Sequence, residues 1–121
     1  MVYRLANGAW CSLLLYAVAV QYNDPDPVRW MFLYGVGAAI CAFAAVRGEV
    51  PLRPVVAWGA IGLALAAADL AFGVGQTNPM GGFPYWGILV DEIVREALGL
   101  TLMSGWMLAL AGWTWRRRQA A

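Results

Sequence analysis

Four long runs of apolar residues alternate with short polar segments along the chain. The runs cover roughly residues 5–22, 28–46, 55–74 and 86–115. A helix needs about 20 mostly apolar residues to cross a bilayer core of ~30 Å, and each run meets that requirement. Because the connecting segments are short, neighbouring helices should run antiparallel. The pattern predicts an all-α, polytopic membrane protein, built as an antiparallel four-helix transmembrane bundle.

The composition favours a bilayer over water as the solvent. Hydrophobic residues make up 62% of the chain and charged residues 12%, whereas soluble domains are about 25% charged. The length of 121 residues indicates a single domain over residues 1–121. All eight basic residues are arginines, and they form no basic stripe that would seat phosphates, so nucleic acid is not an expected partner. Membrane lipids are the expected partners.

The first apolar run has a second interpretation. Arg4, the apolar stretch after it and the sequence Ala17-Val18-Ala19 resemble a secretory signal peptide with its cleavage site. The run is long enough to span a bilayer, which favours a retained first helix.

The arginines predict the orientation of the bundle, because short cytoplasmic loops collect positive charge. Six arginines fall on the side of the N-terminus: Arg4, Arg47, Arg53, Arg116, Arg117 and Arg118. Only Arg29 and Arg95 fall on the opposite side. We therefore expect a multi-pass protein of the cell (inner) membrane with both termini in the cytoplasm.

The acidic residues gather in the outer half of the predicted bundle, where Asp69 lies within the third helix. A buried carboxylate without a partner must be protonated or must find a cation. Arg95 is the natural partner for Asp69 by depth, and Arg29 is the second choice. Whether this pair is structural or lines a site stays open.

The turn "NDPDP" between the first two helices combines structural and functional candidates. Asp26 is a suitable N-cap for the second helix, and Pro27 is suited to its first position. One helix needs only one N-cap, so capping leaves Asn23 and Asp24 unexplained. These two residues are either part of a binding site or structural.

The start of the fourth helix carries a second polar group, in the sequence "DEIVREALGL". Glu92, Arg95 and Glu96 are three or four residues apart and share one helix face. Asp91 and Glu92 are expected in the headgroup region. Arg95 and Glu96 lie deeper, where charge is unfavourable, and they are expected to face inward as a pair or network.

Several chemistries are disfavoured. The chain has no His, so imidazole ligation of haem, zinc or di-iron is absent, and no metal or cofactor is predicted. A hard cation held by carboxylates and loop carbonyls stays open, although no spacing indicates it. Small residues at four-residue spacing predict helix contacts, within the chain or between copies of a homo-oligomer: Ala60, Ala64, Ala68, Gly105 and Ala109.

Two motifs resemble those of the transmembrane protein 220 family. The first is "NDPDP", residues 23–27, followed by Trp30 and Tyr34; the second is E-x-x-R-E-x-x-G, from Glu92 to Gly99. The resemblance implies a small polytopic membrane protein with no settled biochemical activity, and this chain looks shorter than vertebrate members. It marks the same two stretches that the charge distribution selects.

Three classes of function remain. The first is a non-catalytic binding or accessory subunit with an outward-facing acidic and arginine site, bound to other membrane subunits, lipid or a small ligand. The second is a small ion- or proton-coupled transporter that acts as an oligomer. The third is a membrane enzyme using carboxylate acid–base chemistry, which lacks an accompanying nucleophile or metal set. We favour them in that order.

Overall fold

The computed structural model describes residues 1–23, 26–73 and 92–121. These residues form four α-helices and one short 3₁₀ helix, and the described part of the chain contains no strand. The elements are α1 (Val2–Val20), η1 (Gln21–Asn23), α2 (Pro27–Arg47), α3 (Leu52–Gly73) and α5 (Glu92–Ala120). The predicted all-α fold is confirmed.

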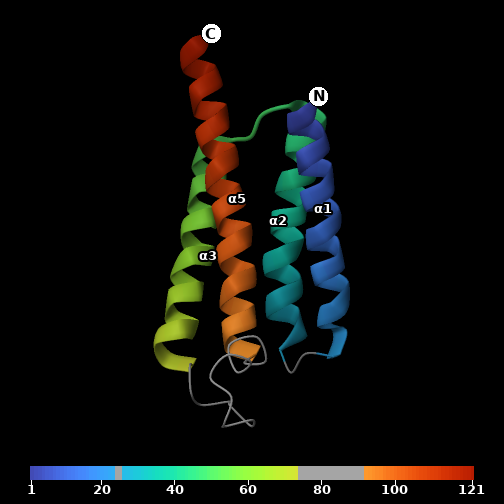
Figure 1. Cartoon of the computed structure of the whole chain (residues 1–121), viewed down its shortest axis with the longest axis vertical. Coiled ribbons are helices and arrows are strands. Elements are labelled where there is room, and N and C mark those ends of the chain that lie inside the picture. The colour runs from blue at the N-terminus through green and yellow to red at the C-terminus, as the bar shows by residue number, and fades with distance from the viewer. Residues whose placement is uncertain (24–25, 74–91) are drawn as a thin grey trace.

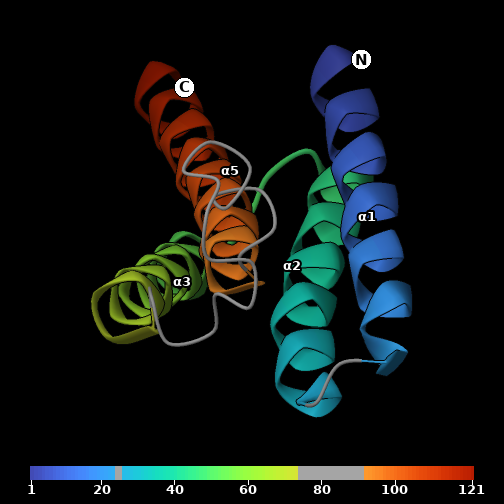
Figure 2. The ribbon, with the colours of Figure 1, turned by 60° about the horizontal axis from the view of Figure 1, so that its bottom comes forward.

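The helices pack as two hairpin-like pairs. Helix α1 lies antiparallel along α2, and α3 lies antiparallel along α5, while the backbones of α2 and α5 have few close approaches (Figures 1 and 2). Both chain termini and the turn at Gly48 lie at one end of the bundle, called the terminal end below (Figure 1). The other end, where α2 begins and α3 ends, is called the Arg29 end.

Three of the helices are long and apolar enough to cross a membrane. The candidate spans are Pro27–Arg47, Leu52–Ala71 and Val94–Ala120. Helix α1 has 19 residues but is not among them, because Arg4 and Asn7 lower its hydropathy. The crossing of the membrane by α1 therefore stays a prediction.

Two helix ends differ from their predicted positions. Helix α3 begins at Leu52, three residues before the predicted start, and includes Pro54. A proline is tolerated in the first turn because the N–H groups there have no partner within the helix. Helix α5 continues to Ala120 through the three consecutive arginines. The predicted start of the fourth helix at residue 86 lies outside the described residues.

The core lies between the two helix pairs and is filled by long apolar side chains. Leu100, Met103 and Met107 of α5 are fully buried. Gly37 of α2 makes room for Met103, because a Cβ at Gly37 would lie 2.8 Å from the Met103 sulfur. Glycine at this position therefore lets α2 approach the core of α5.

The small-residue stripes do not contribute to this core. Ala60, Ala64 and Ala68 are exposed on α3, and Gly105 and Ala109 are exposed on α5. They do not mediate the helix contacts within the chain. A role between copies of a homo-oligomer stays a prediction.

Local signals set both ends of α2. Asp26 occupies the N-cap position and Pro27 is the first helical residue, as predicted, but the Asp26 side chain makes no capping hydrogen bond. The helix ends at Arg47, and the C-cap residue Gly48 has a φ of 79° and donates its N–H to the Ala44 carbonyl at 2.8 Å. Glycine adopts this left-handed conformation without the steric cost that other residues incur.

Candidate functional site

An ion pair joins α2 to α3 at the Arg29 end. The Nη2 atom of Arg29 lies 3.4 Å from Oδ1 of Asp69. Arg29 is in the first turn of α2, and Asp69 is in the last turns of α3. The Arg29 side chain is 39% exposed and that of Asp69 is 20% exposed. The pair is therefore partly screened and carries less energy than a fully buried one.

The second carboxylate oxygen of Asp69 has a different environment. Oδ2 is buried and has no hydrogen-bond partner among the described residues. A buried acceptor without a donor loses hydration that nothing replaces, which costs roughly 1–3 kcal/mol. Asp69 therefore has one oxygen paired with Arg29 and one buried oxygen whose hydrogen-bonding capacity no described residue uses.

Aromatic side chains support Arg29 from its own helix. The Arg29 guanidinium carbon lies 4.9 Å from the ring centroid of Trp30. Trp30 stacks on Tyr34, one helical turn away, with ring centroids 6.1 Å apart. Trp30 is 2% exposed, so its ring is fixed by packing. A cation over a fixed indole ring is attracted to the π face, and this contact orients Arg29 toward α3.

Helix α5 meets this aromatic group at Gly99. The Tyr34 hydroxyl occupies the space beside Gly99, and a Cβ there would overlap with it. Glu96 lies on the same helix three residues before Gly99 and is partly buried. The turn motif and the fourth-helix motif are thus in contact through Tyr34 and Gly99.

The predicted site residues have different outcomes. Asp69 pairs with Arg29, and Glu96 is partly buried on α5 near the Gly99 contact with Tyr34. The partner of Asp69 is Arg29, the second choice from the sequence, and not Arg95. Asp24 lies outside the described residues, as do the side chains of Asn23 and Glu92, so their roles stay predictions.

Arg95 is the clear correction. It was expected to face inward beside Glu96, but its side chain is exposed. Adjacent helix positions differ by about 100° around the axis, so Glu96 and Gly99 can face α2 while Arg95 does not. Near the end of a span, an arginine can extend along its helix to the headgroup region.

The described residues hold no group of three Cys, Asp or Glu side chains that could bind a metal ion. Among the described residues around Asp69 and Tyr34, the polar groups are the Arg29 guanidinium, the Asp69 and Glu96 carboxylates and the Tyr34 hydroxyl. Such a group suits hydrogen bonding and ion pairing with a ligand or a partner helix.

Sequence reasoning missed a buried polar contact between α1 and α5. Asn7 is 0% exposed, donates its amide to the Tyr3 carbonyl at 2.8 Å, and accepts from Trp106 Nε1 at 3.2 Å. Trp106 also stacks on Trp10, with centroids 5.1 Å apart. A lone amide within an apolar helix was the available signal, because such residues commonly bond across helices in membranes.

Polar contacts also close the terminal end. Arg117 donates to the Gly48 carbonyl at 3.3 Å, and Arg118 lies 3.6 Å from Glu49. The Val50 N–H donates to the buried Thr114 hydroxyl at 3.3 Å. These bonds attach the turn between α2 and α3 to the last turns of α5.

Comparison with known proteins places these residues in a family. Residues 13–112 match the family model described as "Transmembrane family 220, helix". Transmembrane protein 220 of Xenopus laevis is 25% identical over 107 residues, which cover 88% of this chain and 57% of that protein. The chain thus spans little more than half the length of this relative.

No solved structure matches the chain. The family match over these residues includes the side chains described at the Arg29 end: Arg29, Trp30, Tyr34, Asp69, Glu96 and Gly99. Since the match extends over most of its length, this small membrane protein belongs to the transmembrane 220 family.

Proposed function

We propose that this chain is a non-catalytic binding or accessory subunit, and that Asp69 receives a hydrogen-bond donor or a cationic group from its partner. The observation that carries the proposal is the buried Oδ2 of Asp69, which has no donor among the described residues. Burial of that atom is unfavourable in the isolated chain. A partner that packs at this end and inserts an N–H or O–H group into the packing around Asp69 removes this penalty on binding.

The surroundings of Asp69 support binding over catalysis. Arg29 holds the first carboxylate oxygen and is itself held over Trp30. This arrangement fixes the direction of the free oxygen, and a preorganised acceptor loses little entropy when a ligand binds. The distribution of arginines along the chain supports an orientation in which the Arg29 end faces the outside of the cell.

The test uses Asp69→Asn, which keeps the shape of the side chain and removes its charge. The chain offers a matched control in Glu49→Gln, because Glu49 forms the other acid–arginine pair, with Arg118, at the terminal end. Each variant would be expressed with an affinity tag in its native host, crosslinked in the membrane, and purified in a mild detergent.

The expected result is a crosslinked partner or bound ligand with the wild type and with Glu49→Gln, and its loss with Asp69→Asn. Circular dichroism must show unchanged helix content in all three proteins. Equal recovery with Asp69→Asn would contradict the proposal. Flux measurements on reconstituted vesicles distinguish a transporter from a binding subunit. Ion or proton flux that Asp69→Asn abolishes would favour transport over the proposed binding function.

A further inference from the structure

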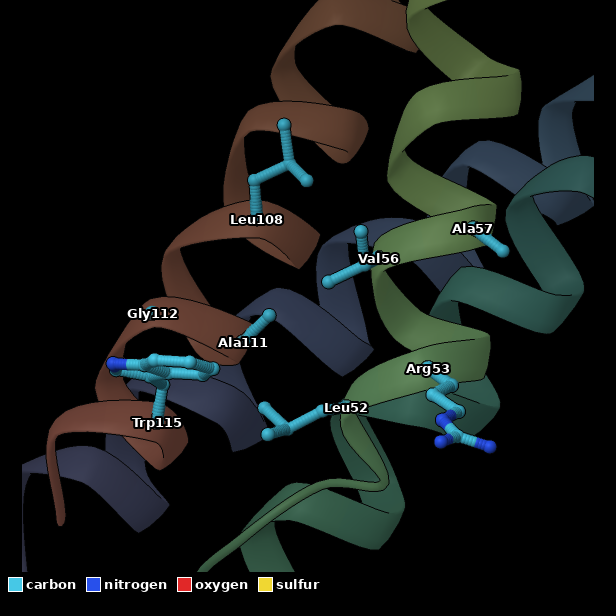
Figure 3. Close-up of a pocket in the computed structure, with 8 residues that line it drawn as sticks. All are labelled: Leu52, Arg53, Val56, Ala57, Leu108, Ala111, Gly112 and Trp115. Carbon is cyan, nitrogen blue, oxygen red and sulfur yellow. The ribbon is translucent and has the colours of Figure 1, made fainter. Parts of the chain in front are cut away.

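A lateral groove of about 690 Å³ opens between α3 and α5 at the terminal end, far along the bundle from Asp69. Its walls are apolar. Figure 3 shows Leu52 and Val56 of α3 directed toward the α5 wall, which carries Leu108 and Trp115. Val56 is 45% exposed and Trp115 is 55% exposed. No described residue of the chain covers these side chains.

The hollow exists because α5 has a glycine in the wall. Gly112 lines the groove, and a Cβ added there would meet nothing within 4 Å. Leu108 and Trp115 are seven residues apart, so the groove extends about 10 Å along the helix. That length suits the part of an acyl chain nearest to its headgroup.

The mouth of the groove has a different chemistry. Arg53, in the first turn of α3, is among its lining residues, and Figure 3 shows its side chain extending from the side of α3 that faces away from α5, near the start of the helix. Trp115 stands on the other side of the mouth. Arginine and tryptophan are the residues that meet lipid headgroups at the edge of a bilayer.

The charge around the mouth selects the class of lipid. Six arginines and one glutamate lie at the terminal end: Arg4, Arg47, Arg53, Arg116, Arg117, Arg118 and Glu49. Arg117 and Arg118 bond to the turn at Gly48 and Glu49, whereas Arg53 is exposed. The excess positive charge attracts a phosphate whose charge no headgroup cation neutralises.

We infer that this groove binds one anionic phospholipid. One acyl chain of the lipid lies between α3 and α5, and the lipid phosphate pairs with the Arg53 guanidinium. The acyl chain covers apolar side chains that the protein leaves open. The lipid also joins the two helices of one pair from the outside, so its binding should raise the thermal stability of the folded chain.

The test measures the melting temperature of the full chain in a neutral detergent, titrated with phosphatidylglycerol or phosphatidylcholine of identical acyl chains. Phosphatidylglycerol should raise the melting temperature in a saturable manner, and phosphatidylcholine should raise it much less. Arg53→Gln should weaken the apparent affinity for phosphatidylglycerol about fivefold, the loss expected for one basic residue near an anionic headgroup. Inorganic phosphate alone should give no shift, because it lacks the chain.

Matched variants separate the groove from general charge attraction. Gly112→Leu fills the groove and should abolish the shift, and Val56→Phe fills it from the opposite wall if the first variant fails to fold. Gly35→Leu, on α2 at a position that also has open space, should keep the shift. Arg47→Gln removes an equal charge from the same end outside the groove and should weaken binding less than Arg53→Gln.

Three outcomes would overturn the inference. The first is an equal rise in melting temperature with both lipids, and the second is an unchanged shift with Gly112→Leu and Val56→Phe. The third is a lipid-free dimer that Gly112→Leu dissociates, which would assign the groove to a second copy of the chain.

Discussion

The hydroxyl of Tyr34 on α2 lies in the space that Gly99 leaves open on α5. This contact joins the two helix pairs near the Arg29 end, and it joins the turn motif to the fourth-helix motif. A larger residue at Gly99 would displace Tyr34, and Tyr34 supports the Trp30 ring beneath Arg29. The geometry of the Asp69 site therefore depends on a glycine that touches neither charge.

Gly99→Ala should destabilise the chain by about 1–3 kcal/mol, because the added Cβ overlaps with the Tyr34 hydroxyl. The measurement is unfolding in mixed detergent micelles, followed by circular dichroism. Gly35→Ala is the control, since its Cβ would meet nothing within 4 Å and should be neutral or slightly stabilising. Tyr34→Phe combined with Gly99→Ala should recover part of the loss. Equal effects of the two alanines would show that the contact is not tight.

Asp69 should be energetically coupled to Arg29 and not to Arg95. A double-mutant cycle with Asp69→Asn and Arg29→Gln should give a coupling energy of about 0.5–1 kcal/mol, at the lower end of the range for contacting residues, because Arg29 is 39% exposed. The same cycle with Arg95→Gln should be additive. Coupling to Arg95 of equal size would contradict the observed pairing.

Asn7→Leu should cost about 1–3 kcal/mol in the free energy of unfolding, because it leaves the Trp106 indole N–H without its acceptor. Ser12→Ala on the same helix is the control. Ser12 is exposed, and its hydroxyl donates to the Gly8 carbonyl of its own helix. Its replacement should therefore change the free energy of unfolding by no more than about 0.5 kcal/mol. Fluorescence of Trp106 in a variant without the other tryptophans would show whether the indole has moved.

Labelling with a membrane-impermeant maleimide would test the orientation. With Cys11 and Cys41 replaced by Ala, we expect a cysteine at Tyr22 to react from outside the cell and one at Gln119 only after permeabilisation. Both positions are exposed, at the Arg29 end and the terminal end respectively. The reverse pattern would place the Asp69 site in the cytoplasm.

The helices could be predicted from the sequence because hydropathy and length depend on local composition. The direction in which a side chain points around the helix axis depends on how the helices pack, and hydropathy does not reveal that packing. Depth alone made Arg95 the first choice for Asp69, although Arg95 is exposed and Arg29 makes the contact. The sequence gives the position of a residue along the membrane normal. Which residues at the same depth are in contact depends on which helices pack together.

The contact between Asn7 and Trp106 escaped prediction for another reason. One amide among apolar residues has no spacing to indicate its partner, and Trp106 lies 99 residues away in the chain. Only the packing of α1 against α5 shows that this indole is directed inward.

The arrangement in two helix pairs has a consequence for the order of assembly. Helices α1 and α2 are adjacent in the chain, so this pair can form during synthesis before α5 exists. The second pair must wait for α5, and only then can Tyr34 and Asn7 find Gly99 and Trp106. The contact surface between the two pairs is thus the last part of the bundle to form. A chaperone, a protease or a partner protein that recognises incompletely folded chains would therefore bind at this contact surface.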